Sequence, residues 1–208
     1  MSRTLVIDCA TEACSVALFD EGALVAGDWR LLGRGHAEQL VPMISALPDK
    51  GRADRIAVDI GPGSFTGIRV GLAAAKALAL AWRVEVVGYG GPALVAAMAR
   101  AEAGEQPIDV AMSGGHGEWF VQRFSAEGTA IEEALSLKPD EAARRSSASL
   151  VAGSQAEALV AMLRTGNALH LLPDARHFAS LPAAALIADP RPAYGRAPDA
   201  RLPAAAAV

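Results

Sequence analysis

The 208-residue sequence contains few charged, aromatic and sulfur-bearing side chains: 20% of its residues are charged, 5% are aromatic and two are cysteine. Two cysteines are too few for a small secreted fold that is cross-linked by several disulfides. No run approaches the roughly 18 consecutive apolar residues that span a bilayer. The net charge is −4, and the basic residues are scattered rather than gathered into the patch that a free-standing nucleic-acid binder presents. We therefore expect neither a membrane protein nor a protein that binds nucleic acid alone.

The hydrophobic content of 52% is enough for a substantial buried core. The N-terminal stretch carries an early aspartate, Asp8, and lacks a small-residue cleavage site after a long apolar run. We expect a strand there rather than a signal peptide, and a cytoplasmic location. Cys9 and Cys14 are expected to be small buried apolar residues.

Periodicity predicts an alternation of strands and helices along the whole chain. The first half is predicted to contain strands Thr4–Ile7, Ser15–Phe19, Ala23–Trp29, Arg55–Ile60 and Val84–Gly88 and helices Gly33–Leu47, Ile68–Trp82 and Pro92–Ala103. The second half is predicted to contain strands Ile108–Met112, Glu118–Phe124, Thr129–Leu137 and Leu169–Leu172 and helices Asp140–Arg145, Gln155–Thr165 and Phe178–Ala188.

The order of these elements predicts a duplicated βββαβα layout and thus an α/β fold. Glycine, glutamate, glutamine and proline gather around residues 104–107 and suggest a domain boundary. We expect one domain over residues 1–104, a smaller and diverged one over residues 105–189, and a loosely held tail over residues 190–208.

A glycine-rich loop follows the strand that ends at Ile60 and leads into a helix. Such a turn at a helix N-terminus suits an anion. The pattern is neither that of a P-loop nor that of a dinucleotide fingerprint, and the next lysine, Lys76, lies too far into the helix. We therefore favour a structural turn that starts a helix. The residues of this motif loop are Gly61, Pro62, Gly63, Ser64, Thr66, Gly67 and Arg69.

The stretch Gly61–Leu72 resembles the most distinctive motif of the TsaB/YeaZ family, within the Gcp-like (M22 glycoprotease-like) superfamily. Ile7–Leu18 resembles that family's opening strand and turn, His36–Met43 its first helix, and Pro192–Arg196 its closing Pro-x-Tyr-x-Arg. The resemblance is strong over residues 3–90 and thin beyond. It implies two related domains of the actin/Hsp70/sugar-kinase (ASKHA, ribonuclease H-like) fold.

The resemblance also implies a role in making threonylcarbamoyladenosine on tRNA. The family pairs with a catalytic paralogue, TsaD, is joined by the ATPase TsaE, forms a homodimer when alone, and reaches tRNA only through the complex. TsaD carries His-x-x-x-His metal ligands where this chain has Tyr89–Leu94 without a histidine, and the four histidines here lack metal-ligand spacing. We accordingly expect a non-catalytic subunit, with no catalytic residue, no metal and no cofactor.

An alternative arises at the hairpin Met112–Glu118, where the chain departs from the usual pattern of the family. Its small residues resemble the phosphate-binding hairpin of the catalytic paralogue, because backbone N–H groups can approach a phosphate there. A plain glycine turn is the favoured interpretation. The alternative is a nucleotide-binding protein or weak ATPase that takes ATP or ADP. Its candidate residues are Asp8, Thr11, Ser113, Gly114, Gly115 and His116.

Two predicted helices carry continuous stripes of small and apolar residues, which allow close approach of another helix. The family resemblance makes these helices the pairing surface for TsaD or a second copy. The opposing interpretation is that the stripes cover their own sheet. If the stripes pair, Ala75→Arg breaks pairing and leaves the monomer folded. The stripe residues are Leu40, Ile44, Gly71, Leu72, Ala75 and Ala79.

Overall fold

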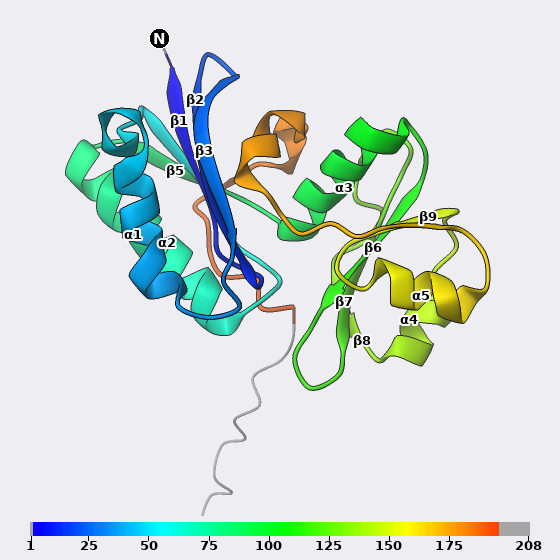
Figure 1. Ribbon diagram of the computed structural model, residues 1–208. Helices are drawn as coiled ribbons and strands as arrows, with labels where there is room; N and C mark the ends of the chain where they lie inside the picture. The colour runs from blue at the N-terminus through cyan, green and yellow to red at the C-terminus, as the bar shows by residue number, and fades with distance from the viewer. Residues whose placement is uncertain (1, 196–208) are drawn as a thin grey trace, which may run out of the picture.

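The structure is a computed structural model that describes residues 2–195 and shows two lobes, each built on one β-sheet (Figure 1). The first lobe holds a six-stranded sheet of order β11-β5-β4-β1-β2-β3. Its strands are β1 (Arg3–Asp8), β2 (Ala13–Asp20), β3 (Ala23–Leu31), β4 (Arg55–Asp59), β5 (Glu85–Tyr89) and β11 (Ile187–Ala188). Its helical segments are α1 (His36–Ala46), η1 (Pro48–Gly51), α2 (Phe65–Trp82) and α3 (Gly91–Ala103).

Side-chain alternation along the strands divides the first sheet into two covered faces. Leu5 and Ile7 of β1 belong to the core beneath α1 and α2. Val6, between them, belongs to a second core with residues of α3 and of η2 (Ala175–Ser180). Figure 1 shows α1 and α2 side by side on the outer side of this sheet, with η2 between the sheet and the other lobe.

The second lobe holds a five-stranded sheet of order β10-β9-β6-β7-β8. Helix α3 packs on one face of this sheet through Val95, Ala96 and Ala99, while Ala142 and Leu159 bring α4 and α5 onto the other face. The elements are β6 (Ile108–Ser113), β7 (Trp119–Phe124), β8 (Leu135–Leu137), α4 (Pro139–Arg145), β9 (Leu150–Ala152), α5 (Ala156–Leu163) and β10 (Asn167–Leu169).

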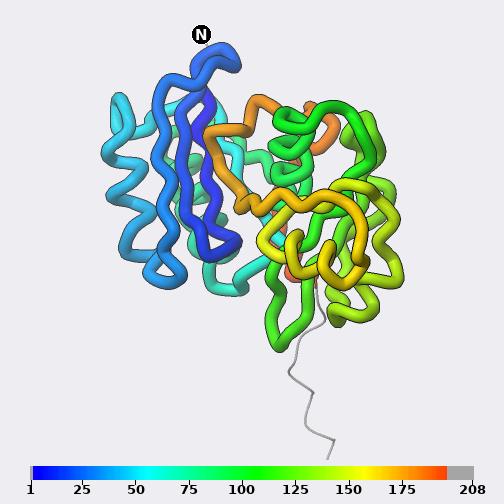
Figure 2. The backbone as a smooth tube through the Cα atoms, turned by 45° about the vertical axis from the view of Figure 1, so that its right-hand side comes forward, coloured from blue at the N-terminus to red at the C-terminus, as the bar shows by residue number. Residues whose placement is uncertain are grey.

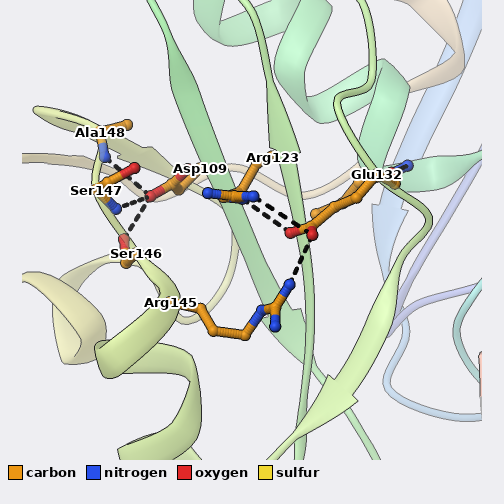
Figure 3. Close-up of polar contacts among 8 residues, drawn as sticks. Asp109, Arg123, Glu132, Arg145, Ser146, Ser147 and Ala148 are labelled. Carbon is orange, nitrogen blue, oxygen red and sulfur yellow. Dashed lines mark hydrogen bonds and ion pairs between the residues drawn. The ribbon is translucent and has the colours of Figure 1, made fainter.

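Two carboxylates hold α4 and the loop after it to the second sheet (Figure 3). Asp109, buried on β6, accepts hydrogen bonds from the Ser146 hydroxyl and from the N–H groups of Ser147 and Ala148. Glu132 accepts from Arg123 on β7 and from Arg145 in the last turn of α4. Arg145 is therefore engaged in an ion pair within the lobe.

The chain crosses back to the first lobe, so the boundary expected at residue 189 is wrong. The segment after β10 passes between the lobes (Figure 2). There the Ser15 hydroxyl accepts from the Ala175 N–H, the Trp29 indole donates to the Pro173 carbonyl, and Phe178 joins the core of the first sheet. Strand β11 then pairs with β5. The first lobe thus combines residues 2–103 with the returning residues from about 173 onward.

The largest error in the predicted elements is the helix expected over Phe178–Ala188. That stretch contains the end of η2, a second 3-10 turn η3 (Ala183–Ala185) and β11. Pro182 interrupts the apolar pattern, because proline lacks the N–H that a continuing helix needs. Strand β9 was not predicted, and β8 is confined to three residues of the strand expected over Thr129–Leu137.

The described part of the predicted tail is held in place. The Ala193 N–H donates to the Ile60 carbonyl at 2.8 Å, Pro190 is buried, and Tyr194 packs against the first core. The expectation of a loose tail is therefore wrong for residues 190–195. Residues 196–208, with Arg196 of the closing motif, lie outside the described residues.

Candidate functional site

A cleft of about 1180 Å³ lies where the motif loop, the β1–β2 turn and the β6–β7 hairpin meet. Cationic Arg34 and Arg69 line it together with acidic Glu12 and Glu38. Its remaining lining consists mostly of glycine, hydroxyl and aromatic side chains. The structure thus brings the motif loop and the candidate nucleotide-binding hairpin to one place, although about 50 residues separate them in the sequence.

The motif loop starts α2 by packing directly on the β1–β2 turn. The Ser64 N–H donates to the Ala10 carbonyl at 2.7 Å, and the Ser64 hydroxyl accepts from the Gly67 N–H at 3.2 Å, which makes Ser64 the N-cap of α2. Glycine is required by this close approach: an added Cβ would lie 2.0 Å from the Ala10 carbonyl oxygen at Gly63 and 1.9 Å from that of Cys9 at Gly67. The favoured interpretation of the loop as a structural helix start is consistent with this geometry.

Arg69 connects the motif loop with the closing segment of the chain. Its guanidinium carbon lies 3.7 Å from the ring centroid of Phe65, and its Nε donates to the Tyr194 hydroxyl at 2.9 Å. The Phe65 and Tyr194 rings are 5.0 Å apart. This stack of two aromatic rings and one cation forms part of the cleft wall. Sequence reasoning named Arg69 but missed Phe65, and only the closing motif pointed to Tyr194.

The β6–β7 hairpin and Thr11 share the cleft, as the nucleotide alternative requires. Thr11 lines it together with the hairpin residues Ser113, Gly114, Gly115 and His116. The hairpin is closed by the Gly114 N–H donating to the Glu118 carbonyl, and the Ser113 hydroxyl accepts from the side-chain amide of Gln155 at 2.8 Å. The Gly114 N–H and the Ser113 hydroxyl therefore already have partners within the protein.

Asp8 does not belong to this cleft, which corrects its assignment to the candidate nucleotide site. It is 1% exposed and accepts a hydrogen bond from the Tyr89 hydroxyl at 3.1 Å. Strand register explains the direction of its side chain, because Val6 and Asp8 share the sheet face opposite α2. Asp8 therefore points into the core shared with α3 and η2.

Asp8 instead forms a buried carboxyl pair with Asp59. Ile7 of β1 pairs with Val58 of the parallel strand β4, so Asp8 and Asp59 are the next residues at the same end of the two strands. Both side chains are 1% exposed. Asp59 accepts from the Gly61 N–H at 2.7 Å, while Asp8 Oδ1 and Asp59 Oδ2 have no partner among the described residues. Burial raises the pKa of Asp8 to about 6, and burial with the neighbouring Asp8 charge raises the pKa of Asp59 well above its usual range.

Asp59→Asn is expected to stabilise the protein increasingly as pH rises. Both carboxyls ionise near pH 3.8 in the unfolded chain and only at higher pH in the folded one, so the free energy of unfolding falls as pH rises from that value through their folded pKa values. The neutral amide removes one of these charges. We therefore expect the variant to exceed wild type in the free energy of unfolding by more at pH 8 than at pH 4.

Urea unfolding of wild type and variant across this pH range measures the difference. Asp54→Asn serves as the control, because Asp54 is exposed and lies at the opposite end of β4. Equal pH slopes in wild type and Asp59→Asn would contradict the raised pKa of Asp59.

The predicted partner-binding residues are core residues, so their assignment to an available surface is wrong. Leu40, Ile44, Gly71, Leu72, Ala75 and Ala79 are all buried beneath α1 and α2 against the first sheet. The stripes therefore cover their own sheet. The opposite side of the two helices is exposed and also largely apolar. We name it the α1–α2 outer face, and it comprises Ala37, Val41, Ala73, Ala77 and Leu80.

Helix α2 thus carries apolar residues on its exposed side as well as on its buried side. Among residues 2–195 it has the length and hydropathy of a membrane span, with 33% of the stretch buried inside the fold. Its buried residues cover β1 and β4, as in a core helix. On its outer side Leu80 is 83% exposed, and on α1 Val41 is 59% exposed.

The histidines occupy separate places. His36, 8% exposed, contacts the Ala13 carbonyl through Nε2 at 3.2 Å, and His116 lies in the β6–β7 hairpin. His170 and His177 lie after β10 and in η2. In the part of the chain that the structure describes, no group of three or more His, Cys, Asp or Glu residues is arranged to hold a metal.

Comparison with known proteins identifies the family of this chain. The family model for TsaD, tRNA N6-adenosine threonylcarbamoyltransferase, matches residues 30–181, which is more than half of the chain. The TsaB protein of Escherichia coli, a tRNA threonylcarbamoyladenosine biosynthesis protein, is 33% identical over 147 residues, which cover 66% of this chain and 63% of that protein. The chain belongs to the TsaB/YeaZ family. The match to the TsaB protein of Haemophilus influenzae is 40% identical over 40% of this chain and 37% of that protein.

The family's solved structures share the two-lobed fold. A Pseudomonas aeruginosa protein described as similar to peptidase YeaZ superposes with a TM-score of 0.75 at 29% identity, covering 87% of this chain and 90% of that one. The predicted actin-like α/β fold is thereby confirmed. The aligned stretch covers less than two thirds of both curated TsaB relatives.

Proposed function

We propose that this chain is a non-catalytic subunit that activates a TsaD-type enzyme for N6-threonylcarbamoylation of adenosine 37 in tRNA, in the cytoplasm. A TsaE-type ATPase joins the two proteins, and tRNA is reached through the complex. Alone, the chain pairs with a second copy. The observation that carries this proposal is membership in the TsaB/YeaZ family. It is supported by the stretch Tyr89–Leu94, which lacks histidine where the family resemblance places the His-x-x-x-His of the catalytic paralogue.

The α1–α2 outer face supports pairing with a protein partner. It combines two exposed large apolar side chains, Val41 and Leu80, with the small residues Ala37, Ala73 and Ala77. Exposed apolar residues on two neighbouring helices are typical of an interface, and small residues let a second helix pair approach closely. The proposed partner surface is thus the side of the helices opposite to the predicted stripe.

Leu80→Arg is expected to weaken binding to the TsaD-type partner about tenfold or more, because it places a charge in an apolar interface. The variant remains folded, since Leu80 is 83% exposed. Calorimetric titration with the purified partner measures the affinity, and sedimentation reports the oligomeric state of the chain alone.

Ile131→Arg is the matched control, because Ile131 is 58% exposed and lies in the second lobe. It is expected to bind like wild type. If Leu80→Arg binds the partner with unchanged affinity, the α1–α2 outer face is not the pairing surface.

A nucleotide-binding protein or weak ATPase remains the second candidate, because Thr11 and residues 113–116 line one cleft. Calorimetry with ATP and Mg²⁺ on the wild type tests it. The discriminating variant is Gly115→Glu, which adds a carboxylate to the cleft at an exposed position without a positive φ. Binding that Gly115→Glu abolishes would favour this second function, and absence of binding to the wild type would reject it.

A further inference from the structure

The only two cysteines of the chain face each other across the first hairpin. The β1–β2 ladder ends with Asp8 opposite Ser15, so Cys9 and Cys14 are the next residues in the same register. Opposed residues of an antiparallel pair have Cα atoms about 4.5–5.5 Å apart, which falls within the range that a disulfide accepts. The two Sγ atoms lie 3.6 Å apart. Formation of a bond between them therefore requires only a short side-chain movement.

The surroundings of the pair favour a dithiol over a metal site. Both thiols are buried on the face of the sheet that α2 covers, with Cys9 2% and Cys14 0% exposed. A structural zinc site needs about four ligands. Within residues 2–195 no third His, Cys, Asp or Glu completes a ligand group around them.

The two thiols are electrostatically unequal. The hydrogen bond with Cys9 lowers the pKa of Cys14, and the Arg30 guanidinium acts in the same direction against burial, Asp8 and Asp28. The same hydrogen bond, burial, and the charges of Cys14, Asp8 and Asp59 raise the pKa of Cys9. Cys14 is therefore the more acidic of the two thiols, and the nucleophilic thiolate forms more readily on Cys14 than on Cys9.

We propose that Cys9 and Cys14 are a redox-active dithiol that a peroxide oxidises to an intramolecular disulfide. The Cys14 thiol releases its proton, and the resulting thiolate attacks one oxygen of hydrogen peroxide so that the O–O bond breaks. The other oxygen leaves as hydroxide and takes up that proton, so Cys14 sulfenic acid and water form. Cys9 sulfur then displaces the hydroxyl from Cys14 sulfur, which gives the S–S bond and a second water. In total the dithiol loses two electrons and two protons to one molecule of hydrogen peroxide, and two equivalents of a low-molecular-weight thiol restore it.

The position of the disulfide connects it to the cleft. The turn between the two cysteines, residues 10–12, lines the cleft, and the Ala10 carbonyl accepts the Ser64 N–H of the motif loop. Cys9 also contacts α2 near Gly71, where an added Cβ would lie 3.7 Å from the Cys9 Cβ. Oxidation thus joins the two strands at the point where the motif loop and α2 rest on them. This inference does not depend on the proposed tRNA-modification role.

Mass spectrometry of the folded full-length chain after treatment with hydrogen peroxide tests the proposal. The expected product is a monomer that has lost two hydrogens, resists alkylation after denaturation, and regains both thiols with dithiothreitol. In Cys9→Ala the same treatment leaves a sulfenic acid on Cys14 that dimedone traps. In Cys14→Ala the remaining Cys9 stays a thiol for longer than it does in wild type.

Three results would overturn the proposal. They are persistence of two free thiols in the folded protein, accumulation of sulfinic or sulfonic acid on one cysteine beside a free second thiol, and disulfide-linked dimers. Circular dichroism during oxidation shows whether the disulfide forms in the folded protein. A disulfide that appears only when the helical signal is lost belongs to the unfolded chain and also overturns the proposal.

Discussion

Ala75→Arg is expected to abolish folding of the monomer. Ala75 is 0% exposed on the side of α2 that faces the first sheet, among Ile7, Val58 and other residues of that core. An arginine there must bury an unpaired guanidinium and displace packed side chains, at a cost of several kcal/mol. That cost is comparable with the total stability of about 5–15 kcal/mol of ordinary domains. Circular dichroism and thermal unfolding of the purified variant measure the effect.

Ala77→Arg is the matched control, since Ala77 lies two residues further along the same helix and is exposed. This variant is expected to unfold within a few degrees of wild type and to lose affinity for the partner. A cooperatively folded Ala75→Arg would contradict the burial of the stripe and restore it as a surface. The pair of variants thus separates the two sides of α2.

Gly67→Ala is expected to destabilise the protein by about 3 kcal/mol or more, because overpacking at a rigid contact carries a large cost. The added methyl group would lie 1.9 Å from the Cys9 carbonyl oxygen, and that oxygen belongs to backbone rather than to a flexible side chain. The first turn of α2 must therefore move off the β1–β2 turn. Chemical denaturation gives the change in the free energy of unfolding.

Gly71→Ala, one turn further along α2, is the control. A Cβ there meets its nearest neighbour, Val58, at 3.5 Å, an ordinary contact distance. Alanine has the higher helix propensity by about 1 kcal/mol, so this variant is expected to match or exceed wild-type stability. A Gly67→Ala variant as stable as Gly71→Ala would show that the loop does not pack on the turn as described.

Much of the first lobe could be predicted because its signals are local. Short apolar segments bounded by turn residues predicted β1 and β2, and apolar residues at helical spacing predicted α1 and α2. The second lobe has shorter elements, and the three residues of β9 carry too little pattern to predict a strand. The return of the chain at Ala175 and β11 depends on contacts with residues far away in sequence, which periodicity does not report.

The side to which a residue points was harder to predict than its element. Alanine-rich α2 is apolar all round, so sequence could not separate the buried Ala75 from the exposed Ala77. Sequence shows that Asp8 and Asp59 each end a strand, but it does not show that these two strands are parallel neighbours. The pairing of the two aspartates therefore could not be predicted without the strand order. The candidate site that joins Thr11 with the second hairpin rested on the resemblance of that hairpin to the one in the catalytic paralogue, together with the matching turn of the first half of the chain.

The central claim is that this chain activates a TsaD-type enzyme through the α1–α2 outer face without contributing a catalytic group. The most direct measurement is the rate of threonylcarbamoylation of adenosine 37 in a reconstituted reaction with the TsaD-type and TsaE-type proteins and tRNA. The account predicts modification with the wild-type chain, the same rate with Ile131→Arg, and little above background with Leu80→Arg or without the chain. Equal modification in the presence and absence of the chain would contradict it.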